Sequence, residues 1–121
     1  MKVSIIMGAY NTAPTLPVSI ESILQQTYED WELIICDDCS KDNTYEVALS
    51  YAKNYSNIRV IRNEKNSRLA YSLNHCLQYA QGEYVARMDA DDFCLPDRLA
   101  KQVAFLDTHP EFAVVGGGVM L

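Results

Sequence analysis

One stretch of the chain sets the pattern for the rest, and it reads Trp31-Glu32-Leu33-Ile34-Ile35-Cys36-Asp37-Asp38-Cys39-Ser40. Residues 31–36 are an apolar, β-branched run of the kind that forms a strand. The polar residues 37–42 follow as a turn, and Asn43 with Glu46 resembles the capping box that begins a helix. A strand, a polar turn and a helix in this order predict the repeating unit of an α/β protein.

The same alternation extends in both directions from this unit. Further strand-like runs cover residues 3–7, 58–61, 84–88 and 113–115, and helical periodicity covers residues 16–24, 43–54, 69–80 and 96–106. Thr15 is the expected cap of the first helix, and Gly82 ends the third. We therefore expect an open, mostly parallel sheet flanked by helices, with right-handed connections between its strands.

Composition limits the class of protein. The chain has 121 residues, 49% hydrophobic and 21% charged, which is typical of one globular domain. Its net charge of −6 argues against binding to a nucleic-acid backbone, which needs a basic face. The run Ala113–Leu121 is much shorter than the ~20 apolar residues of a membrane-spanning helix, and Met1–Val3 leads into a strand, unlike a signal peptide. The expected location is the cytoplasm.

Four cysteines raise the alternatives of redox chemistry or a zinc site. Cys36 and Cys39 match the C-x-x-C pattern, but the two aspartates between them disfavour a reactive thiolate. Cys76 and Cys94 do not form a second closely spaced pair, as a zinc site requires. We expect Cys36 and Cys76 to be small core residues.

Ligands of open α/β sheets bind outside the carboxyl ends of the strands, and this rule selects four segments. They are residues 8–11, Asp37-Asp38, the loop 62–68 and Asp89-Ala90-Asp91-Asp92. In extended backbone, Asp89 and Asp91 project to the same side, an arrangement that suits Mg²⁺ or Mn²⁺ bound together with phosphates. The alternative for this segment is a solvated acidic loop.

The other strand ends carry groups that suit a nucleotide. Asp38 can accept hydrogen bonds from a ribose or a base, or it can simply form a turn. Tyr10 can stack on a base, and Arg68 can meet a phosphate or a base edge, although both residue types are common in ordinary loops. The chain has neither a G-x-G-x-x-G pattern after its first strand nor a P-loop, so a metal ion must offset much of any phosphate charge.

Taken together, these segments resemble family 2 glycosyltransferases over essentially the whole chain. The resemblance is carried by residues 3–11, 22–27, 31–40, 42–44, 82–92 and 95–99. It implies the GT-A (Rossmann-like) fold, a nucleotide-sugar donor, with UDP-sugar favoured, and inverting transfer to the hydroxyl of a carbohydrate or lipid-linked acceptor. It also implies a role in cell-surface polysaccharide synthesis, at the inner face of the membrane.

The resemblance assigns roles to individual residues. Ala9, Tyr10, Asp38, Arg68 and Asp89 correspond to the donor site: Tyr10 packs on the base, Asp38 hydrogen-bonds it, and Asp89 contacts the ribose. Asp91 corresponds to the ligand of Mn²⁺ or Mg²⁺. The chain departs from the family at Arg68, where glycine is frequent, and at Cys39, where glycine or asparagine is commoner.

The family's catalytic base corresponds to no residue of this chain and is expected beyond residue 121. Together with the apolar ending Val119-Met120-Leu121, this predicts that residues 1–121 are the nucleotide-sugar-binding front part of a longer protein and transfer no sugar alone. The remaining acidic candidate, Asp92, is expected to support the helix that starts near Pro96.

Two other functions remain open. One is a nucleotide-sugar-binding module without transfer activity, which these residues alone do not distinguish from an enzyme. The other is a receiver-like signalling domain, which is also acidic and α/β. Its aspartate pair would follow the first strand, whereas here the pair Asp37-Asp38 follows the second.

Overall fold

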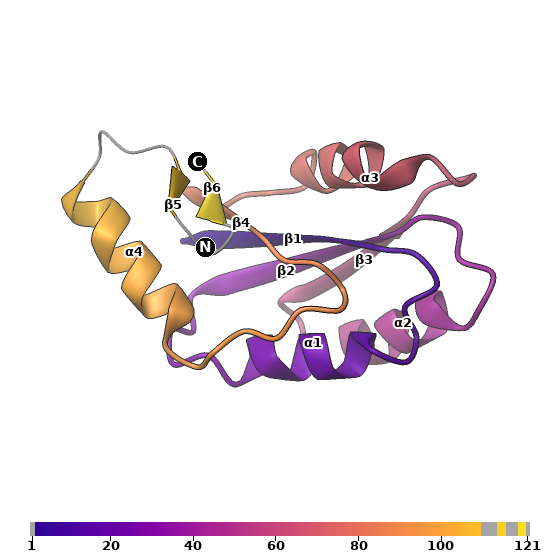
Figure 1. Ribbon diagram of the computed structural model, residues 1–121, viewed down its shortest axis with the longest axis horizontal. Helices are drawn as coiled ribbons and strands as arrows, with labels where there is room; N and C mark the ends of the chain where they lie inside the picture. Colours follow the sequence, from indigo (N-terminus) through magenta and orange to yellow (C-terminus); the bar gives the residue numbers. More distant parts are fainter. Residues whose placement is uncertain (1, 110–113, 116–118, 121) are drawn as a thin grey trace.

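The structure is a computed structural model that describes residues 2–109, 114–115 and 119–120. Its strands form one sheet in the order β3-β2-β1-β4-β6-β5 (Figure 1). The strands are β1 Val3–Ala9, β2 Trp31–Asp37, β3 Ile58–Arg62, β4 Tyr84–Arg87, β5 Val114–Val115 and β6 Val119–Met120. The helices are α1 Leu16–Leu24, α2 Thr44–Asn54, α3 Arg68–Leu77 and α4 Arg98–Thr108.

The expected mostly parallel α/β sheet is confirmed. β1 pairs in parallel with both β2 and β4, and β2 pairs in parallel with β3, whereas β6 pairs antiparallel with β4 and β5. The chain runs outward from β1 to β3 and then returns through α3 to place β4 on the other side of β1. The strand order therefore reverses beside β1, which is where open α/β sheets bind ligands.

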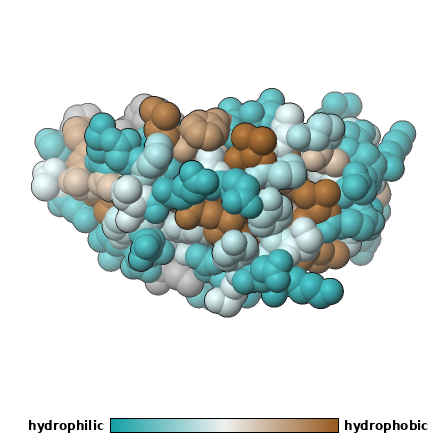
Figure 2. All heavy atoms as spheres, turned by 90° about the horizontal axis from the view of Figure 1, so that it is seen from below, coloured by the Kyte–Doolittle hydropathy of each residue, from teal (hydrophilic) through white to brown (hydrophobic). Residues whose placement is uncertain are grey.

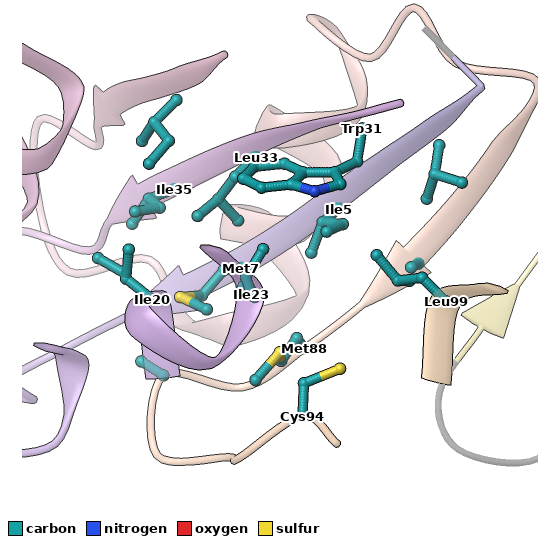
Figure 3. Packing of buried hydrophobic residues seen from close by; sticks show 14 of the residues in the cluster. Ile5, Met7, Ile20, Ile23, Trp31, Leu33, Ile35, Met88, Cys94 and Leu99 are labelled. Carbon is teal, nitrogen blue, oxygen red and sulfur yellow. The ribbon is translucent and has the colours of Figure 1, made fainter. Parts of the chain in front are cut away.

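Helices cover both faces of the sheet, with α1, α2 and α4 on one face and α3 on the other (Figure 1). Because successive side chains of a strand point to opposite faces, the central strands need apolar residues at nearly every position. Ile5 and Met7 of β1 pack with Ile20 and Ile23 of α1 in the larger core cluster (Figure 3). Ile6 belongs to a smaller cluster, with Ile34, Cys36 and Cys76, on the α3 side.

Full burial of each large apolar side chain contributes about 1.5–3 kcal/mol, so these two clusters supply most of the driving force that holds the helices on the sheet. The expectation that Cys36 and Cys76 are core residues is confirmed, because both are fully buried. By contrast, Leu69 and Leu77, which helical periodicity assigned to the packed face of α3, are 42% and 44% exposed. The buried residues of α3 are Ser72 and Cys76, so the part of the helix that packs most closely on the sheet lies between Leu69 and Leu77.

Helix starts differ from the sequence expectation because polar side chains bind neighbouring loops instead. Asn43 occupies the N-cap position of α2 without a side-chain capping bond, so the predicted capping box is wrong. Asp42 takes over, since it accepts hydrogen bonds from the amide and hydroxyl of Thr44. The hydroxyl of Thr15 donates to the carbonyls of Thr12 and Ala90 rather than capping α1.

At the carboxyl-terminal side of the chain, α4 begins at Arg98 rather than at Pro96, with Asp97 in the N-cap position. The expected fifth strand is confirmed at Val114–Val115, and Ala113 lies outside the described residues. Among the described residues, no helix is both long enough and apolar enough to cross a bilayer. The outer face of the helix layer carries separate apolar patches among hydrophilic residues (Figure 2), which is ordinary for a protein surface.

Candidate functional site

A small pocket lies at the carboxyl ends of β1 and β2. It has a volume of about 70 Å³, and three of the residues expected to bind a donor line it: Ala9, Tyr10 and Asp38. Gly8, Leu69 and Ser72 complete its wall. The adjacent strands place these groups together, because Ala9 pairs with Asp37 and the amide of Asp38 donates to the Ala9 carbonyl over 2.8 Å.

Two features leave this pocket open to a flat apolar group. Tyr10 is 39% exposed, which leaves part of its ring free for stacking. A Cβ atom at Gly8 would lie only 2.6 Å from Cδ1 of Leu69, so the absence of a side chain at Gly8 keeps space between the strand end and Leu69. Sequence reasoning missed Leu69 as a wall of the pocket, since its helical spacing suggested a core position.

The carboxylate of Asp38 is buried and anchors the loop that follows β3. Its Oδ1 accepts hydrogen bonds from Nδ2 of Asn63 at 2.8 Å and from the amide of Ser67 at 2.7 Å. Its Oδ2 accepts a bond from the amide of Arg68 at 2.8 Å. A carboxylate oxygen accepts about two hydrogen bonds. Oδ2, which has one partner among the described residues, therefore retains an acceptor position on the pocket residue.

Asp37, the neighbour of Asp38, is engaged in holding the fold. Its carboxylate, fully buried, accepts hydrogen bonds from the amide and hydroxyl of Ser40 and forms an ion pair with Nε of Arg62 at 3.1 Å. The Arg62 guanidinium also lies 4.5 Å from the centre of the Tyr45 ring. Of the aspartate pair, Asp38 is thus the member that lines the pocket.

Backbone strain gathers at the same edge of the sheet. Asn11, Cys39 and Arg68 have φ angles of 51°, 59° and 74°, in the left-handed region that favours glycine. At Asn11 a hydrogen bond offsets the strain. Its Oδ1 accepts a hydrogen bond from the amide of Lys41 at 2.8 Å, which connects the loops after β1 and β2. The expected departures at Cys39 and Arg68 therefore fall on backbone positions where glycine is the less strained residue.

Arg68 itself does not line the pocket through its side chain. Its amide holds Oδ2 of Asp38, whereas its side chain is exposed. Arg68 directs this amide to Asp38 in the strained left-handed conformation described above. Arg68 is therefore joined to the site through its backbone amide, and its exposed guanidinium can meet a ligand from outside the pocket.

An acidic cluster follows β4, on the other side of β1. Asp89, Asp91 and Asp92 each bring a carboxylate oxygen within 4.8 Å of the other two. Oδ2 of Asp92 accepts the amide of Asp89 at 3.1 Å, so Asp92 closes this turn and does not support the start of α4 as expected. The hydroxyl of Ser19 in α1 donates to the carbonyls of Asp89 and Asp92 and holds the turn against the helix.

The chemistry of this cluster fits a hard divalent cation. All three side chains offer carboxylate oxygens, the ligands that Mg²⁺ and Mn²⁺ prefer. Among the described residues, one ion pair reaches these three carboxylates, between Arg87 and Asp89 at 3.4 Å. One positive charge beside three carboxylates leaves excess negative charge in the turn. Asp91 and Asp92 are exposed, so water and a ligand can complete a coordination shell.

Two of the four cysteines, Cys36 and Cys76, lie together in the smaller core cluster. All four are free thiols. A hydrogen bond with Cys76 lowers the pKa of the Cys36 thiol. The negative charges of Asp38 and Asp37 act against this and raise the pKa, as expected from the sequence. The same hydrogen bond, together with burial, raises the pKa of Cys76. Both thiols are buried in the core on the side of the sheet that α3 covers.

The strain at Arg68 predicts the effect of replacing it with glycine. Left-handed backbone costs an L-residue ~1–2 kcal/mol, and glycine loses ~0.5–1 kcal/mol through its greater freedom when unfolded. We expect Arg68→Gly to raise the free energy of unfolding by about 0.5–1 kcal/mol relative to Arg68→Ala, which keeps the Cβ atom. Urea denaturation of both variants measures this difference. A glycine variant less stable than the alanine variant would show that this turn stores no strain.

The chain is similar in sequence to known glycosyltransferases. The family described as "Glycosyl transferase family 2" matches residues 4–120. The putative glycosyltransferase EpsE of Bacillus subtilis is 56% identical over 121 residues, which cover 99% of this chain and 44% of EpsE. The Escherichia coli protein WfgD, a UDP-Glc:alpha-D-GlcNAc-diphosphoundecaprenol beta-1,3-glucosyltransferase, is 40% identical over 104 residues, covering 86% of this chain and 40% of WfgD. The chain spans less than half of either relative.

Solved structures agree with these relatives. TarS 1–349 of S. aureus in complex with UDP-GlcNAc superposes with a TM-score of 0.85 and 31% identity, over 91% of this chain and 32% of that one. The mannosyltransferase PcManGT of Pyrobaculum calidifontis, in complex with GDP-Man and Mn²⁺, gives a TM-score of 0.81 and 28% identity over 87% and 32% of the two chains. The expected GT-A fold is confirmed by this likeness, and the chain belongs to glycosyltransferase family 2.

Proposed function

We propose that this chain forms the nucleotide-sugar-binding part of a metal-dependent, inverting glycosyltransferase that uses a UDP-sugar. The observation that carries the proposal is the juxtaposition of two features on either side of β1. The pocket of Ala9, Tyr10 and Asp38 lies at the ends of β1 and β2, and the cluster of Asp89, Asp91 and Asp92 follows β4. A nucleoside bound in the pocket directs its diphosphate toward the acidic cluster.

In this proposal the base stacks on Tyr10 and donates a hydrogen bond to the remaining acceptor position of Asp38. Asp89 accepts hydrogen bonds from the ribose, and Asp91 holds Mn²⁺ or Mg²⁺. The bound ion supplies neutralisation of the charge that develops on the departing diphosphate. The guanidinium of Arg68 meets the donor at the rim of the pocket.

Transfer itself needs a general base within about 3 Å of the acceptor hydroxyl. Asp38 is occupied by the loop after β3, and Asp92 by the amide of Asp89. A carboxylate beside a cation is a weak base, because the positive charge lowers its pKa. We therefore place the base outside residues 1–121, as part of a longer enzyme.

The acceptor and the cellular role follow from the relatives rather than from the pocket. WfgD is by its name a transferase that acts on a sugar diphosphoundecaprenol, a lipid-linked acceptor. We extend this to a carbohydrate or lipid-linked hydroxyl acceptor here, in cell-surface polysaccharide synthesis at the cytoplasmic face of the membrane. The bound UDP-GlcNAc of TarS supports a UDP-sugar donor, and the Mn²⁺ of PcManGT supports a divalent ion.

The first test removes one charge from the acidic cluster. Asp91→Asn should weaken UDP binding in the presence of Mn²⁺ by more than about tenfold, or 1.4 kcal/mol, because an amide is a poorer ligand for a hard cation. Isothermal calorimetry with Mn²⁺ or with excess chelator measures this change.

Asp97→Asn provides the matched control, since Asp97 is an exposed carboxylate at the start of α4 that pairs with Lys101 and does not belong to the cluster of Asp89, Asp91 and Asp92. This control should bind UDP as the unaltered chain does. Equal affinity of the unaltered chain for UDP in chelator and in Mn²⁺ would refute metal-dependent binding.

The second test addresses the contact with the base. If Asp38 accepts a hydrogen bond from the base, Asp38→Ala should reduce the differences in affinity among UDP, GDP and ADP, not just lower all three. Loss of a partner for a buried N–H group costs roughly 1–3 kcal/mol and falls on the nucleotide that uses it. If the three nucleotides keep the same ranking and the same gaps, Asp38 is a turn residue only.

A further inference from the structure

We infer that Asn63 is a positioning residue that determines which base the pocket accepts, because it occupies one oxygen of Asp38 and leaves the other for the ligand. This inference rests on the proposed nucleoside site. Asn63 follows β3 directly and is 3% exposed. Its amide nitrogen in the backbone donates to the carbonyl of Asp37 at 2.9 Å, which fixes its position beside the end of β2.

The side chain of Asn63 is fully engaged. Nδ2 lies 2.8 Å from Oδ1 of Asp38 and 2.9 Å from the hydroxyl of Ser72. On its other side, Oδ1 of Asn63 lies 2.9 Å from Nδ1 of His75 and 3.3 Å from the Cys36 thiol. Both donors and both acceptor positions of the amide therefore have partners, so the side chain has a single orientation.

The partners also fix which end of the amide faces Asp38. An ionised carboxylate accepts hydrogen bonds and has no hydrogen to donate, so Nδ2, the donor end of the amide, must face it. The Ser72 hydroxyl donates to the carbonyl of Arg68 at 3.1 Å and can therefore accept from Nδ2 as well. The remaining oxygen then accepts from Nδ1–H of His75. Rotation of the amide by 180° would place two acceptors against each other at Asp38 and two donors against each other at His75.

This orientation makes the two oxygens of Asp38 unequal. Oδ1 has two donors, Asn63 and the amide of Ser67, and is saturated. Oδ2 has the amide of Arg68 and one position left. A base that presents a single N–H between two carbonyls, as uracil does, matches one free acceptor. Guanine presents two N–H groups side by side and suits a carboxylate with acceptor positions on both oxygens.

The test is to compare UDP and GDP binding by calorimetry in Mn²⁺ for the unaltered chain and for Asn63→Ala. Removal of the amide frees an acceptor position on Oδ1, so the ratio of GDP to UDP dissociation constants should fall by about tenfold. A purely structural role would weaken both nucleotides equally and leave the ratio unchanged, which would overturn the inference.

Gln26→Ala is the matched control for loss of a buried amide. Gln26 is 5% exposed, and its side chain binds Leu95 and Leu99 on the α1 side of the sheet, away from Asp38. It should lower the melting temperature as Asn63→Ala does, without changing the nucleotide ratio. An equal fall in the ratio in this control would also contradict the inference.

His75→Ala keeps the test decisive if Asn63→Ala does not fold. His75 is half-buried, so its removal leaves the core intact while it frees one end of the Asn63 amide. The ratio should fall in the same direction by a smaller factor, and an unchanged ratio would overturn the inference. If the unaltered chain itself shows no preference for UDP over GDP, the proposed UDP-sugar donor fails instead.

Discussion

β1 pairs in parallel with β2 along its whole length and with β4 along its first four residues, and this double pairing constrains the rest of the molecule. The register places Ala9 beside Asp37, so Tyr10 and Asp38 leave the sheet at the same level. β4 pairs as far as Arg87, opposite Ile6, and the acidic turn begins two residues later. A shift of one residue in the pairing of β2 or of β4 would move the side chains of that strand to the other face of the sheet.

The pairing brings the strand ends together, and buried polar bonds then give the edge its shape. Asp38 joins β2 to the loop after β3, Asn11 joins the loops after β1 and β2, and Ser19 joins α1 to the turn after β4. Each bond contributes only about 0.5–1.5 kcal/mol, but an unpaired buried carboxylate would cost several times more. Two of the left-handed residues take part in such bonds, Asn11 through its side chain and Arg68 through its amide to Asp38.

Much of this arrangement could be predicted from the sequence, because it depends on strong local patterns. The apolar runs predicted β1 to β4 within one or two residues, and the strand-end rule selected Tyr10, Asp38, Asp89 and Asp91. The resemblance to the family named the same residues. The strand predictions are confirmed because hydrophobic periodicity is a local pattern that does not depend on tertiary contacts. The site residues follow from the position of the strand ends and stay predictions.

The failures concern polar side chains whose partners are distant in sequence. Asn43 and Glu46 fit a capping box, yet Asp42 takes that role, and Asp92 closes its own turn instead of supporting α4. Asn63 carried one usable signal, its place just after a strand. Its choice of Asp38, Ser72 and His75 as partners depends on how α3 packs across β1 and β2. Local spacing does not encode such contacts.

In the proposed site, one edge of the sheet, on both sides of β1, holds a nucleotide and a divalent ion at once. The most direct measurement is a crystal structure of the chain with UDP and Mn²⁺, in which anomalous scattering locates the manganese. We expect a manganese peak at the Asp91 carboxylate, with uracil against Tyr10 and within hydrogen-bond distance of Oδ2 of Asp38. Manganese away from residues 89–92, or a base outside the pocket of Ala9, Tyr10 and Asp38, would contradict it.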